Sequence, residues 1–465
     1  MEFADPLTFH LPSFAFHYPN RNKPAAFFGA HFKLYPMSAH HIRTKESLIS
    51  KTGVLRSLHF KVHGKRLKAA IKIALGLMLV GTAVFYFLPV KEDTINYNYP
   101  LADTTGEFDN IIGWYQSNTG NTYHLTWSAN KDILLNRYDS IRASNETFRF
   151  SRIDQHSFDM DGDSLTSELT INTQKAQAHT TLSLRSGKTN LELTKLDTGP
   201  YNTREVAFYN DSIKLAGSLL VPNDSSHGIG IVMIHGSGDS DRDSFWYQYQ
   251  AHYLASQGFH VLLPDKRGCG KSMGTWHDAS FSDFAEDALA AVNYMKADSS
   301  AVLNKIGLMG ISQGSWIGHL ASSKSDEVDL IVDVVGSVQT PRKQLSYELR
   351  KDIGMGFFSS VIVPFVSRKV RKRRPVWWEK NGGFDPMPLI TGSSTPILKI
   401  SAEKDKNVNT RKCVRYIEKL HNTQPELPLD MKVLSGSGHT LFDEETEWIS
   451  HEYLAYVSAW LKKNR

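Results

Sequence analysis

Lys-Ile-Gly-Leu-Met-Gly-Ile-Ser-Gln-Gly, residues 305–314, is a short apolar run that ends in Ser312 between Gly310 and Gly314. The apolar part is typical of a buried strand, and residues 316–321 continue with helical character. A Gly-x-Ser-x-Gly pattern between a strand and a helix marks a sharp turn, in which residues two positions from the serine must lack bulk. The stretch therefore predicts a strand, a tight turn and a helix, with Ser312 exposed at the corner.

The sequence on both sides of this stretch is typical of a sheet covered by helices. Compact, β-branched, apolar runs of the kind buried on both faces occupy residues 228–234, 259–264, 306–311, 330–335, 396–401 and 431–434. Apolar residues at helical spacing fall at 281–295 and 444–463, and a hairpin, 204–209 with 213–222, precedes the series. This alternation predicts an α/β domain with a mostly parallel sheet over residues 205–465.

An insertion of about 339–394 is too long for a plain crossover between two strands. It contains aromatic and aliphatic residues, among them Trp377 and Trp378, and a basic run at 368–374. We interpret it as a helical cap over the end of the sheet near Ser312, whose apolar residues either bind an apolar chain of a ligand or pack on the core. The basic run is compatible with acidic substrates or lipid head groups and with a solvated helix face.

Charge is unevenly distributed along the 465 residues. The chain has 53 Lys+Arg against 48 Asp+Glu, but residues 1–72 have 12 against 3. A basic stretch before the uncharged run 73–88 predicts a transmembrane anchor at 69–90, with the N-terminus in the cytoplasm and the α/β domain outside. A cleaved signal peptide is the alternative. The charge asymmetry argues against nucleic-acid binding.

The segments that flank the anchor differ from each other. Residues 1–68 have no strand or helix period, so we expect a disordered basic segment there, and translation starting near Met37 is an alternative to a cytoplasmic tail. Residues 91–204 have short alternating runs broken by Asn, Asp and Gly, which predict a small antiparallel β domain. The acidic loop 159–164 lacks the glycine and glutamate of a calcium-binding loop, and Cys269 and Cys413 form no metal pattern.

Several motifs from about Val206 to the C-terminus resemble the α/β-hydrolase family. The run His-Gly-Ser-Gly at 235–238 is similar to the family's oxyanion loop, and 265–272 resembles its Asp-x-Arg-Gly-x-Gly-x-Ser turn. The pattern around Ser312 matches its nucleophile elbow. The most similar subgroups are the serine aminopeptidase-like and dienelactone-hydrolase-like esterases. The resemblance implies an α/β-hydrolase fold, which the upstream β domain lies outside.

Acyl transfer needs a nucleophile, a base, a group that orients the base, and donors for the developing negative charge. We predict Ser312 as nucleophile and His439, which follows the last expected strand, as base. The resemblance places the acid at Asp405, with Glu403 and Asp443 as alternatives.

The oxyanion donors are expected to be backbone N–H groups. The resemblance implies Gln313, which follows the nucleophile, and Ser237, with Gly236 or Gly238 as alternatives to Ser237. The run around Gly270 lacks the first glycine of a phosphate-binding loop. No metal or cofactor is expected.

Two classes of function follow. The first is a serine hydrolase that cleaves a small carboxylic ester through an acyl-enzyme, with peptide and thioester substrates as variants, because no motif fixes the leaving group. The second is a non-catalytic binding module on a hydrolase fold, which the complete set Ser312, His439 and Asp405 disfavours. The sequence leaves the oligomeric state open.

Overall fold

The computed structural model describes most of the chain from Ile111 onward. Described are residues 69, 72, 73, 76, 111–127, 133–138, 145–152, 157–160, 167–172, 181–186, 189–223, 226–298, 302–354, 356, 359–442 and 449–465. Within this part of the chain, no helix is both long and apolar enough to cross a membrane. The predicted anchor, 69–90, and the predicted disordered segment, 1–68, fall almost entirely outside the described residues.

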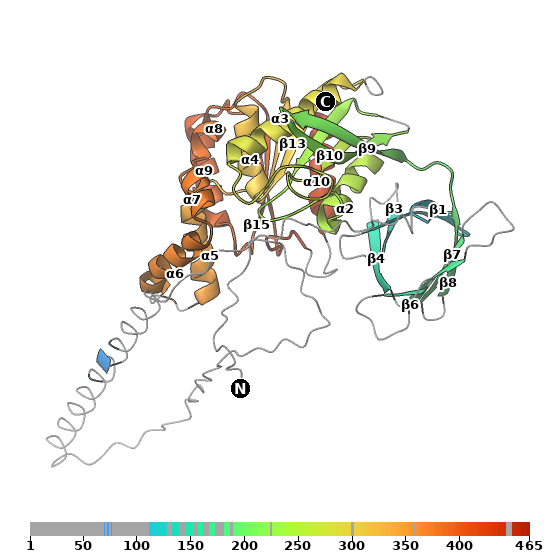
Figure 1. Cartoon of the computed structure of the whole chain (residues 1–465), viewed down its shortest axis with the longest axis horizontal. Helices are drawn as coiled ribbons and strands as arrows, with labels where there is room; N and C mark the ends of the chain where they lie inside the picture. The colour runs from blue at the N-terminus through green and yellow to red at the C-terminus, as the bar shows by residue number, and fades with distance from the viewer. Residues whose placement is uncertain are drawn as a thin grey trace, which may run out of the picture. The chain divides into compact units, whose positions relative to one another are not determined.

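The first folded element is a closed barrel of eight antiparallel strands, seen as a ring in Figure 1. Its strands are β1 (Gly113–Ser117), β2 (Thr122–Trp127), β3 (Ile133–Tyr138), β4 (Asn145–Arg152), β5 (Ser157–Met160), β6 (Ser167–Asn172), β7 (Thr181–Ser186) and β8 (Thr189–Lys195). β8 pairs with β1 and closes the ring. Leu125 pairs with Leu135, and Leu182 with Leu193, and all four are almost completely buried. Apolar pairs of this kind fill a small barrel.

The second element is an eight-stranded sheet in the order β16-β15-β14-β13-β11-β12-β10-β9. Its strands are β9 (Tyr201–Asn210), β10 (Ile213–Pro222), β11 (Ile229–Ile234), β12 (His260–Pro264), β13 (Lys305–Ile311), β14 (Leu330–Val334), β15 (Ile397–Ala402) and β16 (Leu429–Leu434). The strands from β16 to β12 pair in parallel, whereas β10 is antiparallel to both β9 and β12. The predicted mostly parallel sheet is therefore present, and β9 begins before the predicted domain boundary at residue 205.

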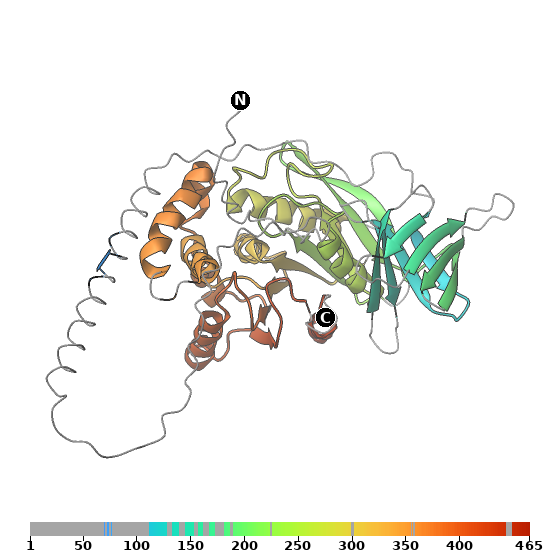
Figure 2. The same cartoon turned by 90° about the horizontal axis from the view of Figure 1, so that it is seen from below.

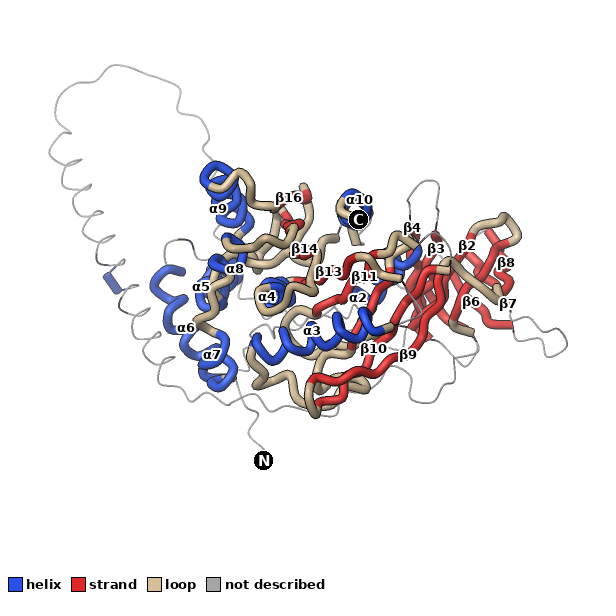
Figure 3. Tube along the Cα trace, turned by 90° about the horizontal axis from the view of Figure 1, so that it is seen from above, coloured by secondary structure: helices blue, strands red, loops and turns tan. Residues whose placement is uncertain are grey.

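Helices cover both faces of this sheet (Figure 3). On one face α3 (Phe281–Ala297) packs against α4 (Gln313–Ser322), and on the other α2 (Phe245–Ser256) contacts α10 (His451–Lys463). The structure corrects the predicted helix 444–463, because Ile449 forms an isolated antiparallel bridge with Phe442. The helix starts two residues later, where the Ser450 side chain accepts a hydrogen bond from the N–H of Tyr453.

The insertion between β14 and β15 is helical, as predicted. It consists of α5 (Pro341–Ile353), α6 (Ser359–Arg373), α7 (Pro375–Asn381) and α8 (Met387–Thr391), followed after β15 by α9 (Thr410–Thr423). The four insertion helices lie beside α4 and α9 rather than beside β9 and β10 (Figures 1 and 3). Figure 2 shows α5–α7 in orange, apart from the green strands. The insertion thus leaves the sheet after β14 and returns to it at the start of β15.

Candidate active site

Ser312 lies at a strained turn between β13 and α4. Its φ of 55° and ψ of −114° are rare for a residue with a side chain. A Cβ on Gly310 would lie 2.2 Å from the Gly314 carbonyl oxygen, and one on Gly314 would lie 2.2 Å from the Ile234 carbonyl oxygen. Both positions therefore require glycine. This close packing is the physical reason for the Gly-x-Ser-x-Gly pattern, and it forces the Ser312 side chain away from the sheet.

His439 reaches Ser312 from a loop that follows β16. Its Nε2 atom lies 3.0 Å from the Ser312 Oγ atom, within hydrogen-bonding distance. The loop is fixed at both of its sides: the Trp246 indole donates to the Thr440 carbonyl (2.9 Å), and the Lys404 N–H donates to the Ser437 carbonyl (2.9 Å). The imidazole is thus held next to the serine by contacts from two other elements.

Asp405 orients the other side of the imidazole. The His439 Nδ1 atom lies 2.8 Å from Asp405 Oδ2, while the N–H groups of Asn407 and Val408 each donate to Oδ1 at 2.8 Å. Asp405 is 5% exposed, so its carboxylate is held in one orientation by three hydrogen bonds. With Nδ1–H donated to Asp405, the Nε2 atom of His439 is the acceptor that faces Ser312.

The two alternative acids differ from Asp405 in the structure. Glu403 is exposed and accepts hydrogen bonds from the Ser435 hydroxyl and the Gly436 N–H, both at 2.9 Å. It therefore shapes the start of the loop that leads to His439 but does not touch the imidazole. Asp443 lies outside the described residues.

The electrostatic surroundings favour a basic imidazole. Burial alone would lower the pKa of His439, but the Asp405 carboxylate raises it through its charge and its hydrogen bond, and Glu348 raises it further. The net effect is a pKa above the ordinary value for histidine. A more basic imidazole is better suited to take a proton from a serine hydroxyl.

The described hydrogen bonds separate two of the oxyanion candidates. The Gly236 N–H donates to the Tyr247 hydroxyl at 2.7 Å, so it is already engaged inside the protein. Gln313 is the first residue of α4, where backbone N–H groups have no partner within the helix. Among the loop residues, the Gly236 N–H is thus committed inside the protein, and Ser237 and Gly238 both stay candidates.

Lys266 fixes the loop that contains Ser237. Its ammonium group is buried and donates to the Gly236 carbonyl and, at 2.6 Å, to the Gly238 carbonyl. Burial lowers the pKa of Lys266 to about 8. Because the carbonyl groups on both sides of Ser237 are drawn toward Lys266, the loop is held in one conformation. The sequence motif at 265–272 gave no sign of this role, since it depends on contacts between separate loops.

A buried ionic cluster lies beneath the elbow and was also missed. Lys399 on β15 donates to both carboxylate oxygens of Asp333 at 3.0 Å, and His319 Nε2 lies 3.1 Å from Asp333 Oδ2. Burial would raise the pKa of Asp333, but Lys399 and His319 hold it below its ordinary value. Asp333 also accepts from the Gly336 N–H, so the cluster ties β14, β15 and α4 together behind Ser312.

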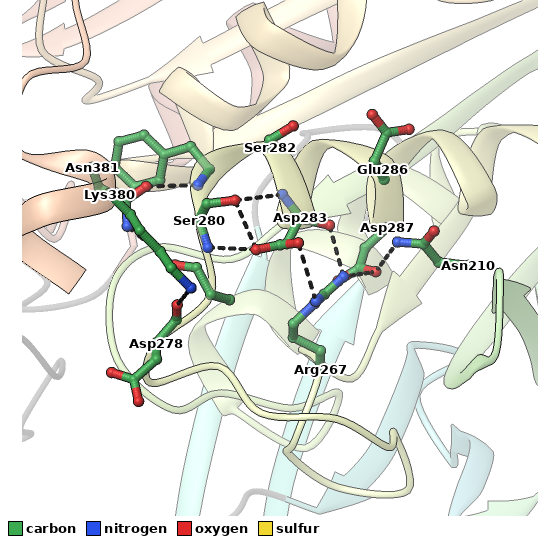
Figure 4. Close-up of polar contacts among 12 residues, drawn as sticks. Asn210, Arg267, Asp278, Ser280, Ser282, Asp283, Glu286, Asp287, Lys380 and Asn381 are labelled. Carbon is green, nitrogen blue, oxygen red and sulfur yellow. Dashed lines mark hydrogen bonds and ion pairs between the residues drawn. The ribbon is translucent and has the colours of Figure 1, made fainter. Parts of the chain in front are cut away.

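Two arginines shape neighbouring loops rather than the site itself. Arg267 forms a bidentate pair with Asp287, both contacts at 2.6 Å, and donates to the Asp283 carbonyl at 2.8 Å. Figure 4 shows this pair beside the capping box at the start of α3. Arg242 pairs with Asp265 in the same manner, at 2.9 and 2.6 Å. These pairs hold the chain on either side of Lys266.

The insertion contributes polar groups near Asp405 and His439. The Tyr347 hydroxyl on α5 donates to the Asp405 carbonyl at 3.1 Å, and the neighbouring Glu348 accepts from the Gln344 amide at 3.1 Å. Burial raises the pKa of Glu348 to about 7, although the charge of His439 counteracts this. Periodicity could place Glu348 on a helix but could not show that α5 faces His439. The described residues contain no cluster of metal-ligating side chains.

Comparison with known proteins agrees with this architecture. Residues 226–362 match a family model described as Serine aminopeptidase, S33. Similar solved structures include a Pyrococcus furiosus esterase, with 18% identity, coverage of 57% of this chain and 91% of that one, and a TM-score of 0.43.

Two further structures are similar to the same extent. Est1E from Butyrivibrio proteoclasticus with bound ferulic acid has 18% identity, coverage of 56% and 98%, and a TM-score of 0.41. The α/β hydrolase GrgF from Penicillium sp. sh18 has 18% identity, coverage of 57% and 99%, and a TM-score of 0.41. The family match covers residues 226–362, and the sheet order together with the strained turn at Ser312 agrees with an α/β-hydrolase fold over residues 201–465.

Proposed function

We propose that this chain is a serine hydrolase that cleaves a carboxylic ester through an acyl-enzyme on Ser312. The observation that carries the proposal is the position of His439, whose two ring nitrogens lie 3.0 Å from Ser312 and 2.8 Å from Asp405. A hydroxyl, an imidazole and a carboxylate in this order form the arrangement that activates serine for acyl transfer.

The chemistry follows from these contacts. As the Ser312 oxygen attacks the ester carbonyl, His439 Nε2 takes the hydroxyl proton, and Asp405 stabilises the resulting imidazolium. The backbone N–H groups of Gln313 and Ser237 stabilise the negative oxygen. His439 then gives the proton to the departing alkoxide, which leaves as an alcohol. In the second half, His439 deprotonates a water that attacks the acyl-enzyme, and it then gives this proton to the Ser312 oxygen as the acid is released.

An aminopeptidase is the second candidate, and Glu348 is the observation that favours it. A carboxyl group near His439 that is partly ionised at neutral pH is suited to pair with a cationic amine of a substrate. The matched family model carries an aminopeptidase description. A thioesterase would use the same triad.

A substrate series tests the proposal and separates its variants. We would compare p-nitrophenyl esters of graded chain length with aminoacyl-nitroanilides, using the full-length protein and Ser312→Ala. The ester proposal predicts turnover of at least one ester that depends on Ser312. Turnover of nitroanilides alone would establish the peptidase instead, and absence of both turnover and covalent labelling would favour a binding module.

We also propose that residues 69–90 anchor the protein in a membrane with the N-terminus in the cytoplasm and the hydrolase domain outside. The support is the distribution of charge, with 12 Lys+Arg against 3 Asp+Glu in residues 1–72 and Glu92 and Asp93 just after the apolar run. Basic residues next to a membrane segment stay on the cytoplasmic side.

A further inference from the structure

A separate cavity of about 280 Å³ lies between the barrel and the hydrolase sheet, which belong to the same compact unit. It is bordered by β1, β2, β9, β10 and α2, and its lining includes no residue of the triad. Its aromatic and uncharged polar side chains include Trp114, His124, Thr126, Tyr201, Gln248 and His252, and two charged residues, Arg242 and Asp243, also line it. Ligand pockets range from roughly 300 to 1,000 Å³, and this cavity, just below that range, has room for one small molecule.

The barrel residues of this cavity point outward from the barrel. Trp114 and His124 pair directly across β1 and β2, on the opposite face from Leu125, because successive side chains of a strand alternate. Although they face outward, Trp114 is only 6% and His124 only 5% exposed. A Cβ on Gly199 would lie 2.0 Å from the Trp114 ring, so the chain entering β9 passes directly over the indole. The two folded parts therefore meet at a close-packed aromatic surface.

Four rings form one cluster at this surface. The ring centroid of Trp114 lies 4.4 Å from that of His124 and 4.9 Å from that of Tyr201, and His124 lies 4.5 Å from His252. Burial lowers the pKa of His252 to about 3, and burial together with His252 holds the pKa of His124 well below its ordinary value. Both imidazoles are therefore neutral at physiological pH.

The hydrogen bonds of the cluster fix opposite tautomers for the two histidines. The Tyr201 hydroxyl contacts His252 Nδ1 and lies 3.3 Å from His124 Nδ1. One O–H can donate to only one of these nitrogens, so the other Nδ1 must carry a proton and donate to the tyrosine oxygen. One histidine consequently has Nε2–H as a donor and the other has a bare Nε2 as an acceptor. Among the described residues, neither Nε2 atom has a hydrogen-bond partner.

Gln248 supplies a second, independent observation. It is 7% exposed, it lines the cavity, and its Oε1 atom is buried without a hydrogen-bond partner among the described residues. A buried carbonyl oxygen without a donor costs about 1–3 kcal/mol, so the position favours a ligand that brings an O–H or N–H group. Arg242 also lines the cavity, but its guanidinium is already paired with Asp265, and the neighbouring Asp243 is acidic. Beside two neutral imidazoles, this lining favours a neutral ligand over an anion.

We propose that this cavity binds a small neutral polyhydroxylated molecule of monosaccharide size. The flat Trp114 ring offers an apolar face, and hydroxyl groups can both donate to Gln248 Oε1 and exchange hydrogen bonds with the two Nε2 atoms. The site does not depend on the function proposed for Ser312. It assigns the barrel a role in recognising a carbohydrate next to the hydrolase.

Ligand-observed saturation-transfer NMR on the full-length protein tests this proposal, with D-glucose, D-galactose, D-mannose and N-acetyl-D-glucosamine as probes. We expect at least one sugar to bind, and Gln248→Met to weaken it by about tenfold, as expected for the loss of one buried hydrogen bond. Gln424→Met is the matched control, because Gln424 Oε1 also lacks a partner among the described residues but does not line the cavity.

The outcomes separate the cavity from the active site. Binding that persists in Ser312→Ala and is lost in Gln248→Met supports the proposal. No binding by any of the four sugars at millimolar concentration would overturn it. Binding that is unchanged in Gln248→Met, or that disappears when Ser312 is covalently blocked, would equally overturn it. Trp114→Phe, which keeps a ring over Gly199, gives a second test of the same surface.

Discussion

The Asp405 carboxylate lies 2.8 Å from Nδ1 of His439, and it keeps that nitrogen protonated. Every step assigned to Ser312 depends on this contact, because it turns the free lone pair of the imidazole toward the serine. The same carboxylate accepts two backbone N–H groups, so its position does not depend on a bound substrate.

We predict that Asp405→Asn lowers ester turnover by about 10³-fold or more, because the amide favours the wrong tautomer of His439. Glu403→Gln is the matched control, since Glu403 is a nearby exposed acid that touches only the loop. Its turnover should stay near that of the wild type. Steady-state kinetics of both variants checks this. A severe loss in Glu403→Gln with little loss in Asp405→Asn would make our assignment of the acid wrong.

Lys266→Met should lower kcat by about 10- to 100-fold, below the loss of a whole oxyanion donor. The reason is that the Gly236 and Gly238 carbonyls lose the ammonium group that holds the loop around Ser237. Lys271→Met is the control, because Lys271 belongs to the next turn and forms an exposed pair with Glu205. Rates of p-nitrophenyl ester hydrolysis measure the effect. Equal rates in Lys266→Met and wild type, with both proteins folded by circular dichroism, would contradict it.

Glu348→Gln should shift the acid limb of the pH profile of kcat/KM to lower pH. The negative charge of Glu348 raises the pKa of His439, so its removal lets the free base form at lower pH. Asp352→Asn, one turn further along α5, should leave the limb in place, because Asp352 is not among the groups that shift the pKa of His439. An unchanged limb in Glu348→Gln, or a shift to higher pH, would argue against the contact.

The proposed topology predicts that full-length protein sediments with membranes and resists carbonate extraction. Protease added to intact spheroplasts should remove the hydrolase domain, since the basic flank of residues 1–72 stays in the cytoplasm. A chain that begins at Lys91 should be soluble and active. A mature N-terminus near Val84 in the soluble fraction would establish cleavage instead, and a protected hydrolase domain would reverse the orientation.

The sheet and the elbow could be predicted from sequence because both leave local patterns. Strands covered on both faces are continuous apolar runs, and the close approach of Gly310 to Gly314 demands glycine at fixed spacing. The start of α10 could not be predicted. The helical spacing of apolar residues extends back to Trp448, but Ile449 forms a β-bridge with Phe442, so the helix begins only after it.

Residues whose roles depend on contacts between distant segments were not accessible from sequence. Lys266 matters because two carbonyls of another loop converge on it, and Glu348 because α5 faces His439. The predicted β domain was recognised by its alternating strands, but closure into a barrel depends on the pairing of β8 with β1, which no local pattern encodes.

Covalent labelling at Ser312 tests the central claim most directly. A fluorophosphonate probe should label the wild type on the peptide that contains Ser312, with loss of ester turnover in proportion to labelling. Ser315→Ala is the control, because the Ser315 hydroxyl is committed to the Gly310 carbonyl at 2.8 Å and its variant should still be labelled. The account predicts that Ser312→Ala keeps the thermal midpoint of the wild type but loses both labelling and turnover. Wild-type labelling or turnover in Ser312→Ala would contradict it.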